Sequence, residues 1–497
     1  MPEYLRYTGY FVYALYVATG LWMLLCAGVQ LHLLWHYRRR KAQPLRPLLP
    51  VPRALPFVTI QVPVYNERAV IGRLLQSLAH LDYPRDRFEV QVLDDSTDAT
   101  SALIDEAAAA LRRQGLHVQV RRRSVRTHFK AGALQEGLGE ARGTLIALFD
   151  ADFLPPADFL RRLVPQFADP AVGLVQARWG HLNRDENYLT RIQTFLLDTH
   201  FSVEQAGRSE AGYFINFCGT AGIWRRRCIE EAGGWDGGVL SEDLDLSYRA
   251  QLKGWRLVYA PEVEVPAELP AELDAFRVQQ FRWTKGMAQA FRKLIGPLWR
   301  AALPRAQKWH GALHLLGSFL FVCVLLNAVL TVPLLLLRNW FPEFVSLTEY
   351  SLFTGLNLVA LTIVYHAGLH SRVTTEKPRF WRDYPLFLVV YMALSVQNAI
   401  AVLQGLSGHR SAFVRTPKKG SGLVRVAAAR WTWINSVEAV LFAYFLCGIG
   451  LSVWLGDYFL LLFFVMIASG LGYLLYHTVK GCVPAKEVSL LPARKAA

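Results

Sequence analysis

Two aspartates separated by one alanine, Asp150 and Asp152, follow an apolar run that is typical of a buried strand. Two carboxylates this close repel each other unless a cation or a shared proton lies between them. Hard carboxylate oxygens suit Mg²⁺ or Mn²⁺, and either ion bridges readily to a diphosphate. Such a triplet also occurs by chance, so its place at the end of a strand is what favours a metal site.

Two further pairs of neighbouring acidic residues could serve the same site. Asp94 and Asp95 follow a second apolar run, where they could bind a ligand or cap a helix that starts near Thr97. Glu242 and Asp243 precede a third helical stretch. An acid at a helix start could take the proton of an acceptor hydroxyl, or it could only cap the helix. Spacing alone does not single out either residue.

The stretch that follows Gln279 combines an apolar stripe with a basic face, which is typical of an amphipathic helix at a membrane interface. Within it, the guanidinium of Arg282 could clamp a diphosphate, and the indole of Trp283 offers a flat face to a sugar ring. The arginine run at 121–123 is interpreted as a solvated face.

Strands and helices that could position these residues alternate along 56–265. Strands are predicted at 57–62, 88–93, 116–120 and 145–149, with helices at 71–81 and 99–111. This alternation predicts an α/β fold with a largely parallel, doubly wound sheet, whose ligands bind at the carboxyl ends of the strands. The candidate polar residues follow that rule.

Apolar runs on both sides of this region are long enough to cross a bilayer, which takes about 20 residues in a helix. Five runs qualify, at about 10–35, 311–337, 351–370, 434–455 and 457–477. Basic residues follow the first run, so we expect an outside N-terminus and a cytoplasmic α/β region. A sixth run, 384–404, has basic segments on both sides. We therefore expect it to lie along the interface, or to dip in and return.

The net charge of +15 suits either nucleic acid or a membrane surface. Lys and Arg cluster beside apolar runs, as at 38–41, so the bilayer is the expected partner and nucleic acid is not. The six cysteines have no metal-site spacing. Charges within the apolar runs are few, Glu438 being the main one, which disfavours a transporter or sensor.

Across about residues 56–300 the sequence resembles the processive family 2 glycosyltransferases of the cellulose-synthase-like group. Seven elements match in order and spacing, at 62–67, 93–98, 130–134, 149–153, 217–224, 241–243 and 279–283. Segments 176–179 and 233–235 look most like the plant mannan and glucomannan synthases, and 413–418 looks like the gating loop of the family. Ser241 stands where Thr is typical, and 281–286 departs from the plant sequences.

On the donor side, the resemblance implies that Tyr65 and Glu67 contact the nucleotide base. It implies that Asp94 or Asp95 binds the nucleoside and that Lys130 contacts the diphosphate.

The resemblance also implies that Asp150 and Asp152 hold the metal, Mg²⁺ or Mn²⁺, and that Asp243 is the general base. Cys218 should lie near the terminal sugar of the acceptor. The acceptor and the diphosphate should be framed by Gln279, Arg282 and Trp283, and the gating loop should close over the donor through Phe413, Thr416 and Lys418.

The expected enzyme is an inverting membrane glycosyltransferase that takes a sugar from GDP-mannose or UDP-glucose to build a β-linked (gluco)mannan or glucan. A glycolipid synthase with a lipid acceptor is the alternative, and a non-enzymatic transporter or sensor a remote one. We expect it in the plasma or inner membrane. The predicted parts are a transmembrane helix (1–36), a cytoplasmic catalytic domain (56–265), interfacial helices (266–305), a transmembrane bundle (306–480) with a gating loop (411–420), and a basic tail (481–497).

Overall fold

The computed structural model describes residues 3–42, 54–349, 353–371, 380–409 and 431–482. The predicted gating loop, with Phe413, Thr416 and Lys418, lies outside the described residues, as does nearly all of the predicted tail.

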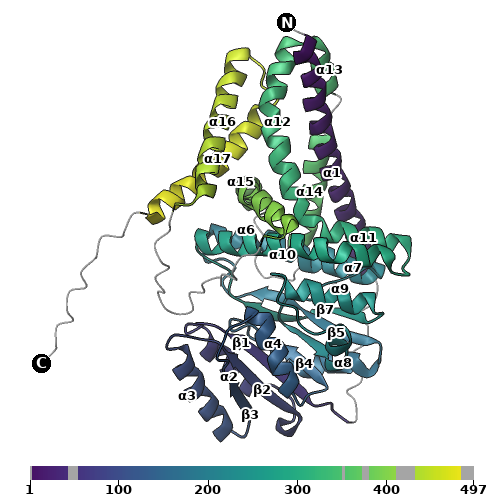
Figure 1. Cartoon of the computed structure of the whole chain (residues 1–497), viewed down its shortest axis with the longest axis vertical. Helices are drawn as coiled ribbons and strands as arrows, with labels where there is room; N and C mark the ends of the chain where they lie inside the picture. Colours follow the sequence, from purple (N-terminus) through teal and green to yellow (C-terminus); the bar gives the residue numbers. More distant parts are fainter. Residues whose placement is uncertain (1–2, 43–53, 350–352, 372–379, 410–430, 483–497) are drawn as a thin grey trace, which may run out of the picture.

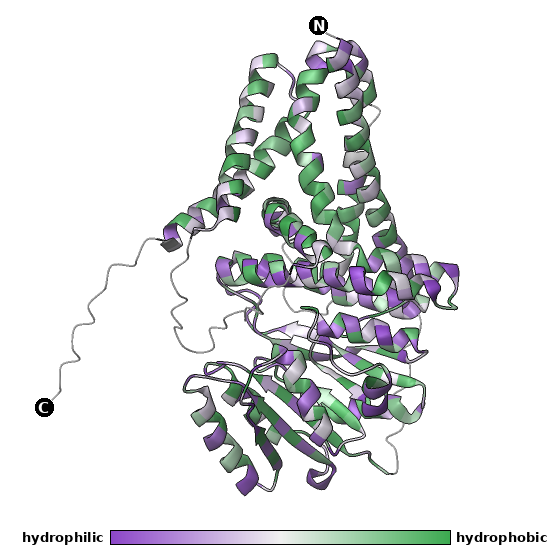
Figure 2. Cartoon of the chain, viewed as in Figure 1, coloured by the Kyte–Doolittle hydropathy of each residue, from purple (hydrophilic) through white to green (hydrophobic). Residues whose placement is uncertain are grey.

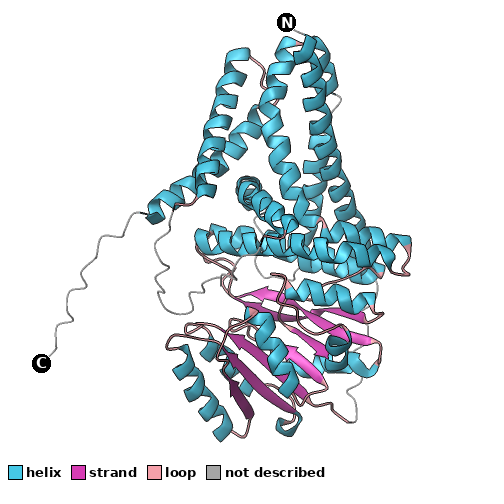
Figure 3. Cartoon of the chain, viewed as in Figure 1, coloured by secondary structure: helices cyan, strands magenta, loops and turns pink. Residues whose placement is uncertain are grey.

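A seven-stranded mixed sheet forms the lower part of the molecule (Figure 3). Its order is β3 (His117–Arg121), β2 (Phe88–Asp94), β1 (Val58–Val64), β4 (Leu145–Leu148), β6 (Gly222–Arg225), β5 (Val172–His181) and β7 (Arg256–Ala267). The first four strands are parallel, as predicted. Strand β6 runs antiparallel to both β4 and β5, whereas β5 and β7 are parallel.

Helices cover both faces of the sheet, whose central strands β1 and β2 are buried on both sides. One core cluster packs α2 (Ile71–Ala79), α3 (Thr100–Arg113) and α5 (Phe159–Leu163) against the strands. In α2 the buried residues recur with helical spacing, at Ile71, Leu74, Leu75 and Leu78. The opposite cluster includes α4 (Phe129–Glu140), α8 (Arg226–Glu231) and α9 (Glu242–Leu252). The sheet is thus doubly wound.

A layer of helices separates the sheet from the upper bundle (Figure 1). It consists of α6 (Tyr188–Thr199), a π-helical segment (His200–Gln205), α7 (Ala206–Ala211), α10 (Leu273–Arg300) and α11 (Arg305–Leu315). These helices carry apolar and polar faces, whereas the bundle above them is mainly apolar (Figure 2). This is the arrangement expected of helices at a membrane interface.

The bundle contains α1 (Glu3–Lys41), α12 (Leu320–Trp340), α13 (Pro342–Glu349), α14 (Phe353–Leu369), α16 (Trp433–Leu455) and α17 (Leu461–Cys482). Among the described residues, five helices are long and apolar enough to cross a membrane: α1, α12 with its preceding turn, α15 (Phe380–Ser407), α16 and α17. This set differs from the five predicted spans. Helix α14 has only 17 residues, whereas α15 qualifies by length and composition.

Helix α15 covers the run at 384–404 that was expected not to cross the bilayer. It is one continuous helix of 28 residues that buries Ser395, Gln397 and Asn398 inside the protein. In Figure 1 it is seen almost end-on, so it runs across the bundle while α1 and α12 run along it. Its interfacial position stays a prediction.

Candidate active site

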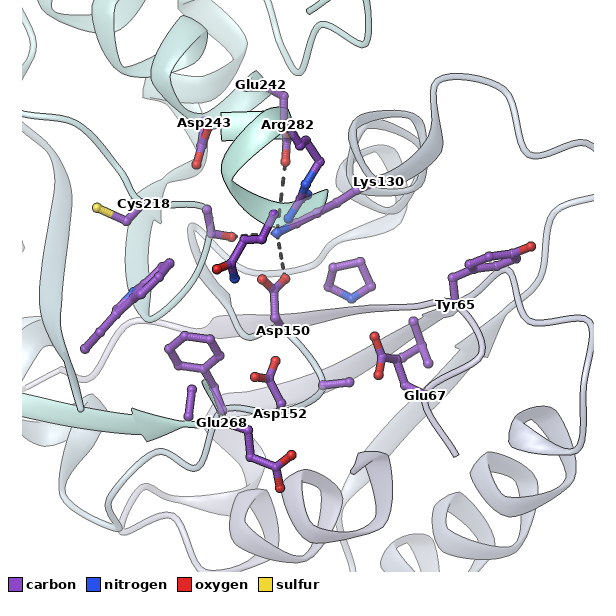
Figure 4. A pocket seen from close by; sticks show the side chains of 18 of the residues that line it. Tyr65, Glu67, Lys130, Asp150, Asp152, Cys218, Glu242, Asp243, Glu268 and Arg282 are labelled. Atoms are coloured by element: carbon purple, nitrogen blue, oxygen red, sulfur yellow. Dashed lines mark hydrogen bonds and ion pairs between the residues drawn. The ribbon is translucent and has the colours of Figure 1, made fainter. Parts of the chain in front are cut away.

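A cavity opens at the carboxyl ends of β1 and β4, beneath α10. It brings together eleven of the predicted site residues: Tyr65, Glu67, Asp95, Lys130, Asp150, Asp152, Cys218, Asp243, Gln279, Arg282 and Trp283. Figure 4 shows Tyr65 at one end and Cys218 at the other, with Lys130, Asp150 and Arg282 between them. The cavity therefore lies where the strand-end rule expects a ligand to bind.

Lys130 lies at the centre of this cavity, in the first turn of α4. Its Nζ is 2.6 Å from Asp150 Oδ1, 2.9 Å from the carbonyl oxygen of Gly219 and 4.0 Å from Glu242 Oε1. Burial alone would lower the pKa of Lys130, but the carboxylates of Asp150 and Glu242 outweigh it and raise that pKa. The ammonium therefore stays charged among carboxylates.

Asp150 and Asp152 follow β4 and are both directed into the cavity (Figure 4). The backbone N–H of Asp150 donates to Thr220 Oγ1 at 2.9 Å, which fixes the turn after the strand. Within the described part of the chain, no group of three or more acidic, His or Cys side chains is arranged to hold a metal. Two carboxylates suit a hard cation that takes its remaining oxygens from a diphosphate and water.

Asp243 stands in the first turn of α9, opposite Gly219. A Cβ at position 219 would lie 3.0 Å from Asp243 Oδ2, and this residue has a φ of +84°, so glycine allows the close approach. Burial, and next the negative charge of Glu242, raise the pKa of Asp243 to about 7, against the opposing effects of Lys130 and Arg282. A carboxylate tuned in this way is a better base near neutral pH than an exposed one.

The end of the cavity near Tyr65 is built from arginines and an aspartate. The guanidinium of Arg126 lies 3.5 Å from the centroid of the Tyr65 ring. Arg123 donates to both oxygens of Asp95, at 3.0 and 2.5 Å, and Arg126 Nε is 3.7 Å from the same carboxylate. This end therefore offers a flat stacking surface with charged groups at its edge.

Asp94 does not line the cavity. It also does not cap the next helix, α3, whose N-cap residue is Ala99. Its carboxylate accepts hydrogen bonds from the Ser101 hydroxyl at 2.7 Å and from Arg122 Nε at 2.8 Å. Burial would raise the pKa of Asp94, but these bonds outweigh it and lower that pKa. The interpretation of 121–123 as a solvated face is thus wrong for Arg123, whose side chain is buried against Asp95. Arg122 is exposed, as expected, although it also pairs with Asp94.

Aromatic side chains gather at the end of the cavity near Cys218. The ring centroid of Trp179 lies 6.4 Å from that of Trp283 and 5.2 Å from that of Phe153. The Cys218 sulfur is 3.5 Å from His200 Nε2, and burial raises the pKa of this thiol, so Cys218 stays protonated. Aromatic faces beside a neutral thiol suit an uncharged, ring-shaped ligand.

Sequence reasoning gave no role to several residues of the lining, among them Arg126, Glu268 and His181. Arg126 comes shortly after a predicted strand, so the strand-end rule could have found it. Glu268 directly follows β7, and His181 is the last residue of β5. Those strands were not predicted, and no signal pointed to the two residues.

The sequence is similar to those of known glycosyltransferases. Residues 54–286 match the family model described as "Glycosyltransferase like family 2". The chain is 36% identical over 447 residues to probable glucomannan 4-beta-mannosyltransferase 3 of Oryza sativa subsp. japonica, a match covering 84% of this chain and 78% of the relative. It is 36% identical over 387 residues to glucomannan 4-beta-mannosyltransferase 2 of Arabidopsis thaliana, covering 74% and 68%.

Among solved structures, mannosyltransferase PcManGT from Pyrobaculum calidifontis, in complex with GDP-Man and Mn²⁺, has a similar fold. The superposition has a TM-score of 0.54 and covers 79% of this chain and 99% of that one, at 23% sequence identity. Agreement at this level supports the fold of the catalytic domain.

Proposed function

Because the chain belongs to the family 2 glycosyltransferases, within the cellulose-synthase-like group that contains the glucomannan 4-β-mannosyltransferases, we propose that it transfers mannose from GDP-mannose to a growing β-linked glycan. The predicted family, fold class and enzyme class are confirmed. One observation carries the proposal. A match over 84% of the chain is longer than the region 54–286, so the likeness to these relatives includes helices outside the catalytic domain.

The proposed reaction is a single displacement with inversion at the anomeric carbon. Asp243 takes the proton of the acceptor hydroxyl as that oxygen attacks. The nucleoside diphosphate leaves from the opposite face, where Lys130 and Arg282 stabilise its developing charge. An α-linked donor then gives a β-linked product.

A divalent cation is the proposed cofactor, with Asp150 and Asp152 as its protein ligands. When bound, such an ion neutralises the diphosphate and makes it a better leaving group. Mn²⁺ accompanies GDP-Man in the Pyrobaculum neighbour, which supports Mn²⁺ here, with Mg²⁺ as the second candidate.

The donor and acceptor take opposite ends of the cavity in this proposal. Tyr65, Glu67 and Asp95 bind the nucleoside, and Arg126 adds a charged planar group at that end. Trp283, Gln279 and Cys218 bind the terminal sugar of the glycan, beneath the helices that would carry the product onward. The catalytic domain faces the cytoplasm, and the plasma or inner membrane is the proposed location. The gating-loop residues keep their predicted role.

The proposal is tested with purified full-length protein in detergent. Radiolabelled GDP-mannose, UDP-glucose and UDP-galactose are supplied in turn, each with Mn²⁺, with Mg²⁺ or with EDTA. Ethanol-insoluble label that β-mannanase destroys, formed from GDP-mannose and lost in EDTA, supports the synthase. Label confined to the lipid extract would indicate the glycolipid synthase instead. Incorporation from UDP-glucose alone would overturn the choice of donor.

A further inference from the structure

Helix α10 carries the acceptor-side residues on one face and two buried cations on another. Arg277 and Lys285 stand just before and just after the segment 279–283, and both side chains are buried. Neither cation lines the cavity. Their contacts explain why charge is placed there, at the junction with the apolar helices.

Both cations are held by glutamines of α15. Arg277 Nε donates to Gln397 Oε1 at 2.9 Å, and Lys285 Nζ donates to Gln404 Oε1 at 2.9 Å. The two glutamines are two helical turns apart, so they lie on the same face of α15. A Cβ at Gly405 would lie 2.8 Å from the carbonyl oxygen of Lys285, so the backbones of α10 and α15 are also in close contact.

Arg277 joins α10 to a third helix. Its Nη2 lies 2.6 Å from Oε1 of Glu438, a fully buried carboxylate in the second turn of α16. The other oxygen of Glu438 accepts a hydrogen bond from Asn435 Nδ2 at 3.1 Å, and Gln397 Nε2 donates back to the carbonyl oxygen of Arg277 at 3.2 Å. The network therefore connects three helices, α10, α15 and α16, at one point.

A buried ion pair is weak evidence of added stability, because it can often be replaced by apolar side chains without loss. Unlike apolar packing, directional hydrogen bonds and ion pairs can fix one rotation and one axial register between helices. A change in the register of α10 would shift Arg282 and Trp283 relative to Asp243. Small misplacements of that kind have large effects on transfer between two bound reactants.

We infer that Arg277 and Glu438 are positioning residues, whose ion pair sets the register of α10 and so directs the sugar to the acceptor glycan instead of to water. This inference rests on the proposed glycosyl transfer. Lys285 and Gln404 form the second attachment of the same helix.

The test uses the full-length protein and two matched double variants. One is Arg277→Met with Glu438→Leu. The control is Arg338→Met with Asp457→Leu, which removes an ion pair of 3.0 Å. Arg338 lies in the last turn of α12 and Asp457 just after α16, and these helix ends point away from the sheet (Figure 1). For each protein, sugar transfer to the acceptor is compared with release of nucleoside diphosphate by hydrolysis, and a melting curve is recorded.

We expect the first variant to lose transfer by about 10- to 100-fold while hydrolysis changes less than about twofold. The control should keep the wild-type ratio of transfer to hydrolysis. The exchanged pair, Arg277→Glu with Glu438→Arg, should recover part of the ratio. If transfer and hydrolysis fall together, the pair has a purely structural role and the inference is wrong.

A second measurement does not depend on activity. Hydrogen exchange of the backbone amides of 279–283 should rise in the first variant and not in the control. If hydrogen exchange is unchanged in the first variant, the inference is wrong, whether or not the wild-type protein transfers sugar. If the wild-type protein transfers no sugar, that result counts against the proposed function alone.

Discussion

Lys130 Nζ lies 2.6 Å from Asp150 Oδ1 and 4.0 Å from Glu242 Oε1, so one ammonium bridges two carboxylates of the cavity. Asp243 is close enough that its charge also raises the pKa of Lys130. Three carboxylates around one cation repel each other strongly once that cation is removed. In the proposed reaction, the same ammonium contacts the diphosphate of the donor.

Lys130→Met should therefore impair catalysis in two ways. Loss of the cation weakens stabilisation of the leaving diphosphate, and we expect kcat to fall on the order of 100-fold. It also removes a charge that lowers the pKa of Asp243, so the acidic limb of the pH profile should move to higher pH. Steady-state rates from pH 5.5 to 9 measure both effects. Lys253→Met, at an exposed position, serves as the control. A fall in rate without a shift of the limb would contradict the electrostatic argument.

Glu242→Gln should move the same limb in the opposite direction. A base with a pKa of about 7 is half protonated at that pH, so wild-type kcat/KM should fall about tenfold per pH unit below it. Removing the negative charge of Glu242 makes ionisation of Asp243 easier, which lowers its pKa and shifts the limb to lower pH. Parallel pH profiles of the two proteins test this. A shift toward higher pH would show that another group controls the limb.

Asp243→Asn should abolish transfer without weakening the fold. The folded-state pKa of Asp243 lies above the usual value, so its contribution to stability is full below about pH 4 and is lost as the pH rises through 7. At pH 8 the ionised side chain is therefore unfavourable, and an amide of the same shape removes that cost. Thermal melts at pH 8 should give a Tm equal to or above wild type. A lower Tm, with activity lost, would point to a structural role.

The sheet was predictable because its first half uses local patterns. The four predicted strands and two predicted helices fall within a few residues of β1, β2, β3, β4, α2 and α3. The second half, with β5, β6 and β7, was not predicted. Strand β6 runs antiparallel to both of its neighbours, whereas strand–helix alternation predicts parallel pairing. The place of β6 in the sheet depends on long-range pairing, which local sequence patterns do not report.

The candidate site was predictable where a ligand-binding residue closely follows a predicted strand in the sequence. Tyr65 directly follows β1 and Asp150 lies two residues beyond the end of β4, so the strand-end rule finds both. The rule did not predict that Asp95 lines the cavity while Asp94 does not. Neighbouring side chains of a strand point in opposite directions, and only the fold decides which of them faces the cavity. The role of Arg122 and Arg123 as their partners likewise depends on the pairing of β3 with β2.

Trp283→Ala should weaken acceptor binding selectively. Trp283 and Trp179 form an aromatic wall of the cavity, with ring centroids 6.4 Å apart, and both belong to the same core cluster as Cys218. Losing one aromatic face costs about 0.5–1.5 kcal/mol, or roughly two- to thirteenfold in the acceptor KM, whereas the donor KM should change little. Trp283→Phe keeps a smaller face and should lie between wild type and the alanine variant.

Trp299→Ala is the matched control, because Trp299 belongs to the same helix and is 40% exposed. Both proteins are assayed with a series of oligosaccharide acceptors at saturating donor. An acceptor KM that rises only in the Trp283 variants supports the assignment of this end of the cavity to the glycan. An equal rise in the donor KM would place Trp283 at the donor instead, and the two ends of the cavity would then have to be exchanged.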